Sequence, residues 1–484
     1  MNFRKFVCTS LVLVFSFLQS NAQTDVVSGN AKTYAGDTLK MYSIDDYITK
    51  NETLISTAIV DADGNFSFEV KVKDVVLAYI DLTVFKGLIF LQPNRKQVIV
   101  LHEKQRIAIQ DQLNPYFRKT EFYVKMLNKD NDDLNYLIPA FDKLYNQSMT
   151  EVYYTRRRYT KASTDSIENY LSSQFVSSNA YFSEYKKYRF ALLDYTAYHR
   201  SKDDIVKQLF TNQEILQNNP AYSELFDELF SNIFTNGKTS AISIPGLYKC
   251  IYDKSYYSLR KTLQADPKVS TERFADYLIL KGLKDSYYSD SFPKDALVAV
   301  ADSLATGSKS KDFKKIAALL SERFTTLLCG YSAPDINLSD IANNEYNLQK
   351  SSGKFVYLTF YNPNSYSAIS DLELIKQVRK DFPAEVLDIV TIIVSQDKND
   401  VQKFVESNKD INWKVLWYNF DTELIKNYNI KAFPTYYLIN PNGILVMNPA
   451  PSPQEYFNEK FTAIFRNWKN EQYRQQYRDN KGVK

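Results

Sequence analysis

The sequence predicts a multidomain α+β protein, with a β-rich N-terminal segment, an all-α middle region and a C-terminal α/β domain. Short β-type runs recur at regular spacing before residue 103, helical periodicity fills 104–326, and buried strands alternate with amphipathic helices after 327. The 484 residues provide length for about three domains.

Residues 1–22 have the pattern of a secretory signal peptide. Arg4 and Lys5 form a short basic start, and an apolar run follows from Phe6 to Leu18. This run is shorter than the about 20 residues of a membrane-spanning helix. We therefore expect a periplasmic or otherwise extracytoplasmic mature chain without a transmembrane segment.

Residues 24–103 are predicted to form a small β-sandwich. Asp63–Gly64–Asn65 is a hairpin signal, and the alternating residues after it place Phe66 and Phe68 on one face. The expected strands are 37–42, 53–60, 66–72, 76–85, 88–91 and 97–101.

Residues 104–326 are predicted to be helical almost throughout. The clearest helix is Lys311–Leu328, because Phe313, Ile316 and Leu320 recur on one face. Arg156–Arg157–Arg158 is a basic run. A solvated helix face is the simpler interpretation of that run, and a site for an anionic partner stays open.

Residues 327–470 are predicted to form the α/β domain, followed by a polar basic tail at 471–484. The run from Phe355 to Phe360 is apolar on both faces, as in a strand buried between helices. The further elements are a helix after Ser367 or Ser370, a strand at 385–395, a helix at 398–408, a hairpin at 435–447 and a helix from Gln454 to about Trp468.

This order of elements, with Phe433–Pro434–Thr435 before the hairpin, resembles the thioredoxin fold. It is most similar to the extracytoplasmic thioredoxin-like proteins of the cytochrome-maturation and peroxiredoxin-like type. Ser332–Leu338, Tyr346–Leu348 and Asp421–Ile430 match further elements of that family. The β-rich start resembles the small sandwich domain of unknown function that often precedes such modules.

The resemblance implies a Cys-X-X-Cys pair where this chain has Ser365 and Ala368. Disulfide exchange needs an attacking thiolate and a second thiol that resolves the mixed disulfide. A serine hydroxyl and an alanine methyl supply neither, and a peroxidatic mechanism also needs a cysteine at this helix start. We therefore predict a degenerate active site and no enzyme activity.

The retained feature is the proline. In the family this residue is cis, and the backbone before it pairs with an extended peptide. The resemblance thus implies a peptide-binding surface at Phe433, Pro434, Tyr361 and Asn364. The alternative is that the turn of the fold requires the proline. Strand addition is the mode of capture that a functional role would use.

Other chemistry is not indicated. His102 and His199 have no ligand-type spacing to a cysteine or to each other, so neither a metal nor a cofactor is expected. Cys250 and Cys329 are a candidate disulfide in an oxidising compartment, or are two buried small residues.

The formal charge of +4 falls to about +2 without Arg4 and Lys5, and it does not suggest nucleic-acid binding. The sequence thus predicts a non-catalytic envelope protein that binds a protein or peptide partner. Two alternatives stay open: an oxidoreductase-related protein that uses other cysteines, and a purely structural envelope subunit.

Overall fold

The computed structural model describes residues 25–480 except 109–110, 112–113, 115–116, 129, 156–159, 238–241 and 352. The expected signal peptide and the run Arg156–Arg157–Arg158 lie outside the described residues. Contacts divide the described chain into two compact units. Of the described residues, the first comprises those within 25–107, 119–202 and 216–225, and the second those within 108–118, 203–215 and 226–480. The domain boundaries expected at 103, 326 and 470 stay predictions.

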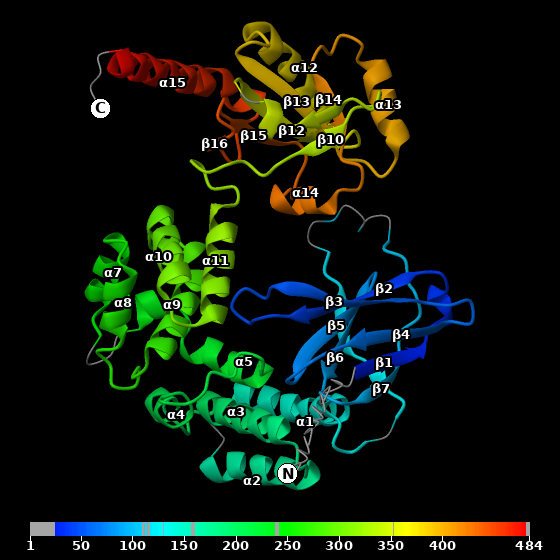
Figure 1. Ribbon diagram of the computed structural model, residues 1–484, viewed down its shortest axis with the longest axis vertical. Coiled ribbons are helices and arrows are strands. Elements are labelled where there is room, and N and C mark those ends of the chain that lie inside the picture. The colour runs from blue at the N-terminus through cyan, green and yellow to red at the C-terminus, as the bar shows by residue number, and fades with distance from the viewer. Residues whose placement is uncertain are drawn as a thin grey trace, which may run out of the picture. The chain divides into compact units, whose positions relative to one another are not determined.

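Two β-sheets with one shared apolar core open the first unit (Figure 1). Their orders are β4-β1-β7-β9 and β3-β2-β5-β6-β8. Val27, Phe68 and Ile80 are fully buried in this core, which confirms the predicted N-terminal β-layer. The strands are β1 (Asp25–Asn30), β2 (Thr38–Ile44), β3 (Glu52–Ile59), β4 (Asn65–Val70), β5 (Val76–Leu82), β6 (Phe85–Leu91), β7 (Lys96–Val100), β8 (Thr120–Tyr123) and β9 (Lys125–Met126).

The turn predicted at Asp63–Gly64–Asn65 is present, although it does not join a hairpin. An Asp61 Oδ1 atom accepts the N–H groups of Asp63 at 2.9 Å and Asn65 at 2.7 Å. Gly64 has φ +89°, a conformation that favours glycine. Because β3 and β4 belong to different sheets, this turn carries the chain from one sheet to the other.

Three strands of the first unit differ from the secondary structure predicted from the sequence. β8 and β9 lie in the segment predicted to be helical, where β8 pairs with β6 in parallel and β9 pairs with β7. β8 contains Thr120, Phe122 and Tyr123, which favour a strand, whereas β9 is the two-residue segment Lys125–Met126, and each strand pairs with the edge of a sheet. β1 was not predicted as a strand, yet it lies between β4 and β7.

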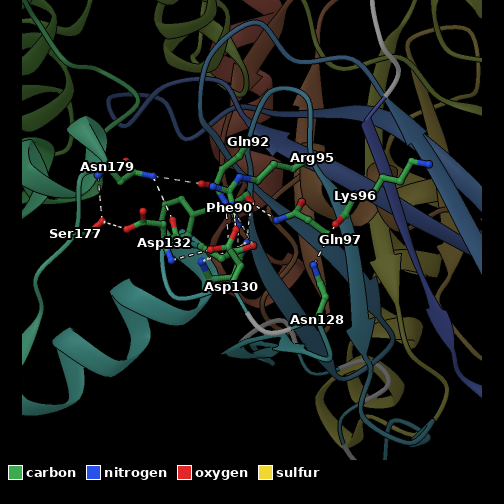
Figure 2. A network of polar contacts seen from close by, with 12 residues as sticks. Phe90, Gln92, Arg95, Lys96, Gln97, Asn128, Asp130, Asp132, Ser177 and Asn179 are labelled. Carbon is green, nitrogen blue, oxygen red and sulfur yellow. Dashed lines mark hydrogen bonds and ion pairs between the residues drawn. The ribbon is translucent and has the colours of Figure 1, made fainter.

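A polar network joins the β-sheets of the first unit to its helices (Figure 2). Asn135 Oδ1 accepts the Phe90 N–H at 2.6 Å, and its amide donates to the Phe90 carbonyl at 2.9 Å. The Ser177 hydroxyl donates to Asp132 at 2.5 Å. The helices are α1 (Leu134–Thr155), α2 (Lys161–Gln174) and α3 (Ala180–Thr196).

The second unit starts with further helices. The helix predicted at Lys311–Leu328 is α11, and Phe313, Ile316 and Leu320 are buried on one face as expected. The helices are α4 (Lys202–Leu209), α5 (Pro220–Leu229), within which the division between units falls, α6 (Ile233–Asn236), α7 (Ile244–Tyr252), α8 (Tyr256–Leu263), α9 (Glu272–Tyr287), α10 (Lys294–Gly307) and α11 (Lys311–Thr325).

The C-terminal part of this unit contains a five-stranded sheet of order β14-β13-β12-β15-β16. β12 pairs in parallel with β13, as predicted, and antiparallel with β15. β14 was not predicted; it extends the parallel part of the sheet. The strands are β10 (Asn337–Ser339), β11 (Glu345–Asn347), β12 (Phe355–Tyr361), β13 (Leu387–Ile393), β14 (Lys414–Trp417), β15 (Thr435–Ile439) and β16 (Leu445–Met447).

Helices cover both faces of this sheet (Figure 1). Every residue of β12 is buried, because α12 and α15 pack on one face and α14 on the other. The fold class is thus confirmed as β-sheets, a helical middle region and an α/β domain. The helices are α12 (Tyr366–Asp381), α13 (Lys398–Ser407), α14 (Thr422–Asn427) and α15 (Phe457–Asn480).

Candidate functional site

The candidate site lies where β12 ends and α12 begins. Ser365 is the N-cap of α12, with extended backbone angles of φ −88° and ψ 120°. Its hydroxyl accepts the N–H of Ala368 at 3.4 Å, so the two positions that the resemblance assigns to cysteines lie on the first turn of one helix. Ala368 is fully buried, whereas the neighbouring Tyr366 is 87% exposed.

The loop before β15 meets this helix start. The Phe433–Pro434 bond is cis, as the resemblance implies. The Ser365 hydroxyl donates to the Phe433 carbonyl oxygen at 2.9 Å and so joins two segments far apart in the sequence. The structure therefore brings Ser365, Ala368 and Phe433 together.

Two further predicted site residues behave differently from each other. Asn364 is exposed, and its N–H donates to the side chain of Asn362 at 2.8 Å. Tyr361 is only 2% exposed and packs against Phe404, with 5.0 Å between the ring centroids. Burial raises the pKa of Tyr361 to about 12. A peptide-contacting role for Tyr361 does not fit this position, because its strand faces α12 and α13.

The candidate disulfide between Cys250 and Cys329 is not formed. Cys250 is buried in α7, with its Sγ atom 3.4 Å from Thr262 Oγ1. Cys329 is a free, exposed residue after α11, and partial burial of its thiol raises its pKa. Cys250 thus fits the alternative interpretation of a buried small residue.

A hollow of about 490 Å³ opens beside Pro434. The sequence did not predict it, because its walls come from α12, the segment before β15, β15 itself and the segment after β16. These walls are formed by Asp371, Asn429, Lys431, Ala432, Pro434, Thr435, Tyr436, Tyr437, Asn448, Pro449, Ala450, Ser452 and Glu455.

Asp371 is the buried charged residue of this hollow, with 6% exposure. One carboxylate oxygen accepts the Tyr436 hydroxyl at 2.7 Å, and the other accepts the Gln454 amide at 2.7 Å. Burial raises the pKa of Tyr436, so this hydroxyl stays a donor. Asp371 shares the apolar stripe of α12 with Ala368 and Leu372. An acid in such a stripe was the signal that sequence reasoning missed.

The described part of the chain has no group of three or more His, Cys, Asp or Glu residues arranged to hold a metal ion. None of its helices combines the length and the apolar character needed to cross a membrane.

The five-stranded sheet, its covering helices and the cis-proline loop define a thioredoxin-like α/β domain. Residues 329–447 match the AhpC/TSA family. Over 119 residues the chain is 25% identical to thiol-disulfide oxidoreductase ResA of Geobacillus kaustophilus, and over 117 residues it is 27% identical to ResA of Bacillus subtilis. These matches cover 25% and 24% of this chain and 67% and 64% of the relatives, about two thirds of their length.

Two solved structures are each similar to a part of this chain. One is the thioredoxin domain of a thiol-disulfide oxidoreductase from Bacteroides vulgatus, with 22% identity and a TM-score of 0.26, covering 28% of this chain and 97% of that chain. The other is a thiol:disulfide interchange protein from Bacteroides sp., with 22% identity and a TM-score of 0.26, covering 28% of this chain and 91% of that chain.

Proposed function

We propose that this protein is a non-catalytic thioredoxin-fold protein of the cell envelope that binds an extended segment of a protein partner. The proposed surface comprises Phe433, Pro434 and Asn364 together with the hollow beside them. The observation that carries the proposal is the hydrogen bond from the Ser365 hydroxyl to the Phe433 carbonyl. At the position where the resemblance implies a reactive thiol, this chain has a hydroxyl that binds its own proline loop.

The chemistry at this helix start argues against redox activity. Ser365 offers a hydroxyl and Ala368 a buried methyl group, and neither can form a mixed disulfide. Cys329 is an alternative nucleophile, but its raised pKa leaves less thiolate at neutral pH. The oxidoreductase-related alternative would have to use this residue or Cys250, which is buried.

Three features support partner binding. Tyr366 and Ile369 expose 87% and 52% of their surface on the first turns of α12, next to the degenerate site. The hollow beside Pro434 provides depth for a side chain. The Phe433 carbonyl has a second lone pair that an extended backbone can use. A purely structural subunit would not need such a hollow.

The envelope location rests on the signal-type sequence at 1–22. Fractionation of cells, followed by N-terminal sequencing of the protein, tests it. A mature N-terminus near Gln23 in the extracytoplasmic fraction is the expected result, and an intact Met1 in the cytoplasmic fraction would contradict it.

Site-specific photo-cross-linking in intact cells tests the binding function. A photoreactive amino acid at Lys431, on the rim of the hollow, should capture a discrete protein. The matched control is Lys403, which is also exposed but lies on α13. Equal capture from both positions, or no capture from Lys431, would refute the proposed surface. Reduction of insulin disulfides by the purified native protein would favour the oxidoreductase alternative.

A further inference from the structure

Among the residues that the structure describes, the carboxylate of Asp371 has no cationic partner. Among the ion pairs of the described residues, none includes Asp371, and its hydrogen bonds come from the neutral side chains of Tyr436 and Gln454. It is 6% exposed and forms part of the wall of the hollow beside Pro434. Within the described part of the chain, Asp371 is therefore a buried acid whose hydrogen-bond donors, Tyr436 and Gln454, are neutral.

Such a carboxylate has unused capacity. Each oxygen carries about two lone pairs, and the two neutral donors occupy one on each oxygen. Removing a carboxylate from water is costly unless an opposite charge and further hydrogen bonds compensate. A cationic donor that enters from the hollow would supply both, and its hydrogen bond would be stronger than a neutral one.

The rest of the wall carries charges of both signs. Glu455 is exposed, and one of its oxygens accepts the N–H of Ser452 at 2.9 Å. Lys431 is exposed and is the cationic residue of the wall. With Asp371 and Glu455 against Lys431, the wall carries one negative charge in excess. Asp371 is the buried one of these three residues.

We infer that the hollow receives a lysine or arginine side chain of the bound partner segment, with its cationic group against Asp371. This inference rests on the proposed function, because it names the side chain that the peptide surface selects. The volume of about 490 Å³ lies within the range of roughly 300–1,000 Å³ that is typical of pockets for small-molecule ligands. The segment would cross the Phe433–Pro434 loop and direct one long basic side chain into the hollow.

The test uses a phage-displayed library of random heptapeptides against the immobilised mature chain. Enriched peptides should share one Lys or Arg position. The best peptide and its analogue with norleucine at that position are then compared by titration calorimetry. On the native protein, the norleucine analogue should bind about tenfold or more weakly. On Asp371→Asn the two peptides should differ by less than about twofold.

A second variant keeps the inference testable if Asp371→Asn does not fold. Lys431→Gln changes an exposed rim residue and removes the competing positive charge. It should raise the affinity for the lysine peptide a few-fold at low salt, and by more than it changes the affinity for the norleucine analogue. A library that enriches no peptide would overturn the proposed function itself. Enriched peptides without a basic position, or equal binding of both analogues to native protein, would overturn this inference alone.

Discussion

Placing two cysteines at Ser365 and Ala368 is the most direct test of the proposed degenerate site. The double substitution Ser365→Cys with Ala368→Cys should create a pair that closes a disulfide, whereas the native site stays inert. The structure supports the geometry, because Ser365 is the N-cap and its Oγ atom lies 3.4 Å from the Ala368 nitrogen. The exposed N–H groups and the dipole at this helix start also favour a thiolate.

The expected stabilities follow from three contributions. Loss of a serine N-cap costs about 0.5 to 2 kcal/mol. A sulfur atom added at Ala368, which is fully buried, costs about 1 to 3 kcal/mol through overpacking. Closing a loop of about four residues returns about 2 kcal/mol in the chain-entropy description. The reduced variant should therefore be less stable than the native protein, and oxidation should recover about 2 kcal/mol.

Thiol counting with a maleimide reagent under denaturing conditions, after mild oxidation, measures the bond. Chemical denaturation with and without reductant then measures its contribution to stability. A background carrying Cys329→Ser removes the exposed native thiol, and the single variant Ser365→Cys reports mispairing. If the oxidised double variant shows two more free thiols than its background, the two positions do not face each other, and the assignment of a lost cysteine pair is wrong.

Three further predictions concern individual hydrogen bonds. Ser365→Ala should lower the free energy of unfolding by about 1 to 2 kcal/mol in urea denaturation, because the helix cap and the bond to the proline loop are both lost. Asn135→Ala should cost about 1 to 3 kcal/mol, because it leaves the buried Phe90 N–H without its acceptor, whereas the Phe90 carbonyl keeps a hydrogen bond from the Gln97 side chain. The exposed Asn128→Ala, which removes the same kind of strand contact, should cost less than about 1 kcal/mol. A hydrogen bond from Ser177 holds the pKa of Asp132 below its usual value, so this carboxylate stabilises the fold above about pH 4 and less as pH falls through the lowered pKa. NMR titration of Ser177→Ala should show the Asp132 pKa moving upward, and an unchanged value would remove the role of this bond.

The α/β domain was largely predictable because its signals are local. The run Phe355–Phe360 is apolar on both faces and is buried on both faces of the sheet. The resemblance to the thioredoxin fold, rather than a local signal, predicted that the Phe433–Pro434–Thr435 loop lies next to the start of α12, and the structure joins this loop to Ser365. Residue type alone was sufficient for the strand but not for the position of the loop.

Elements that depend on distant partners were not predictable. β1 contains Ser28 and Gly29, which weaken a strand pattern. A Cβ atom at Gly29 would lie 2.3 Å from the Ile99 carbonyl oxygen, so this glycine permits the close approach of β7. β8 and β9 likewise become strands by completing sheet edges. Neither cause is visible in a local window of sequence.

The hollow beside Pro434 shows the same limit at the level of function. Asp371 and Glu455 are far apart in the sequence and meet only because α12 and the segment after β16 flank the same strand, β15. Ser365 and Ala368 are not among the residues that line the hollow, so this longer-range arrangement does not depend on a cysteine pair at those two positions. Ser365 still contacts the proline loop through its hydroxyl, as a capping residue that also fixes the loop position. The proposed recognition role requires only shape, hydrogen bonds and charge, and the hollow with its buried Asp371 supplies these without a nucleophile.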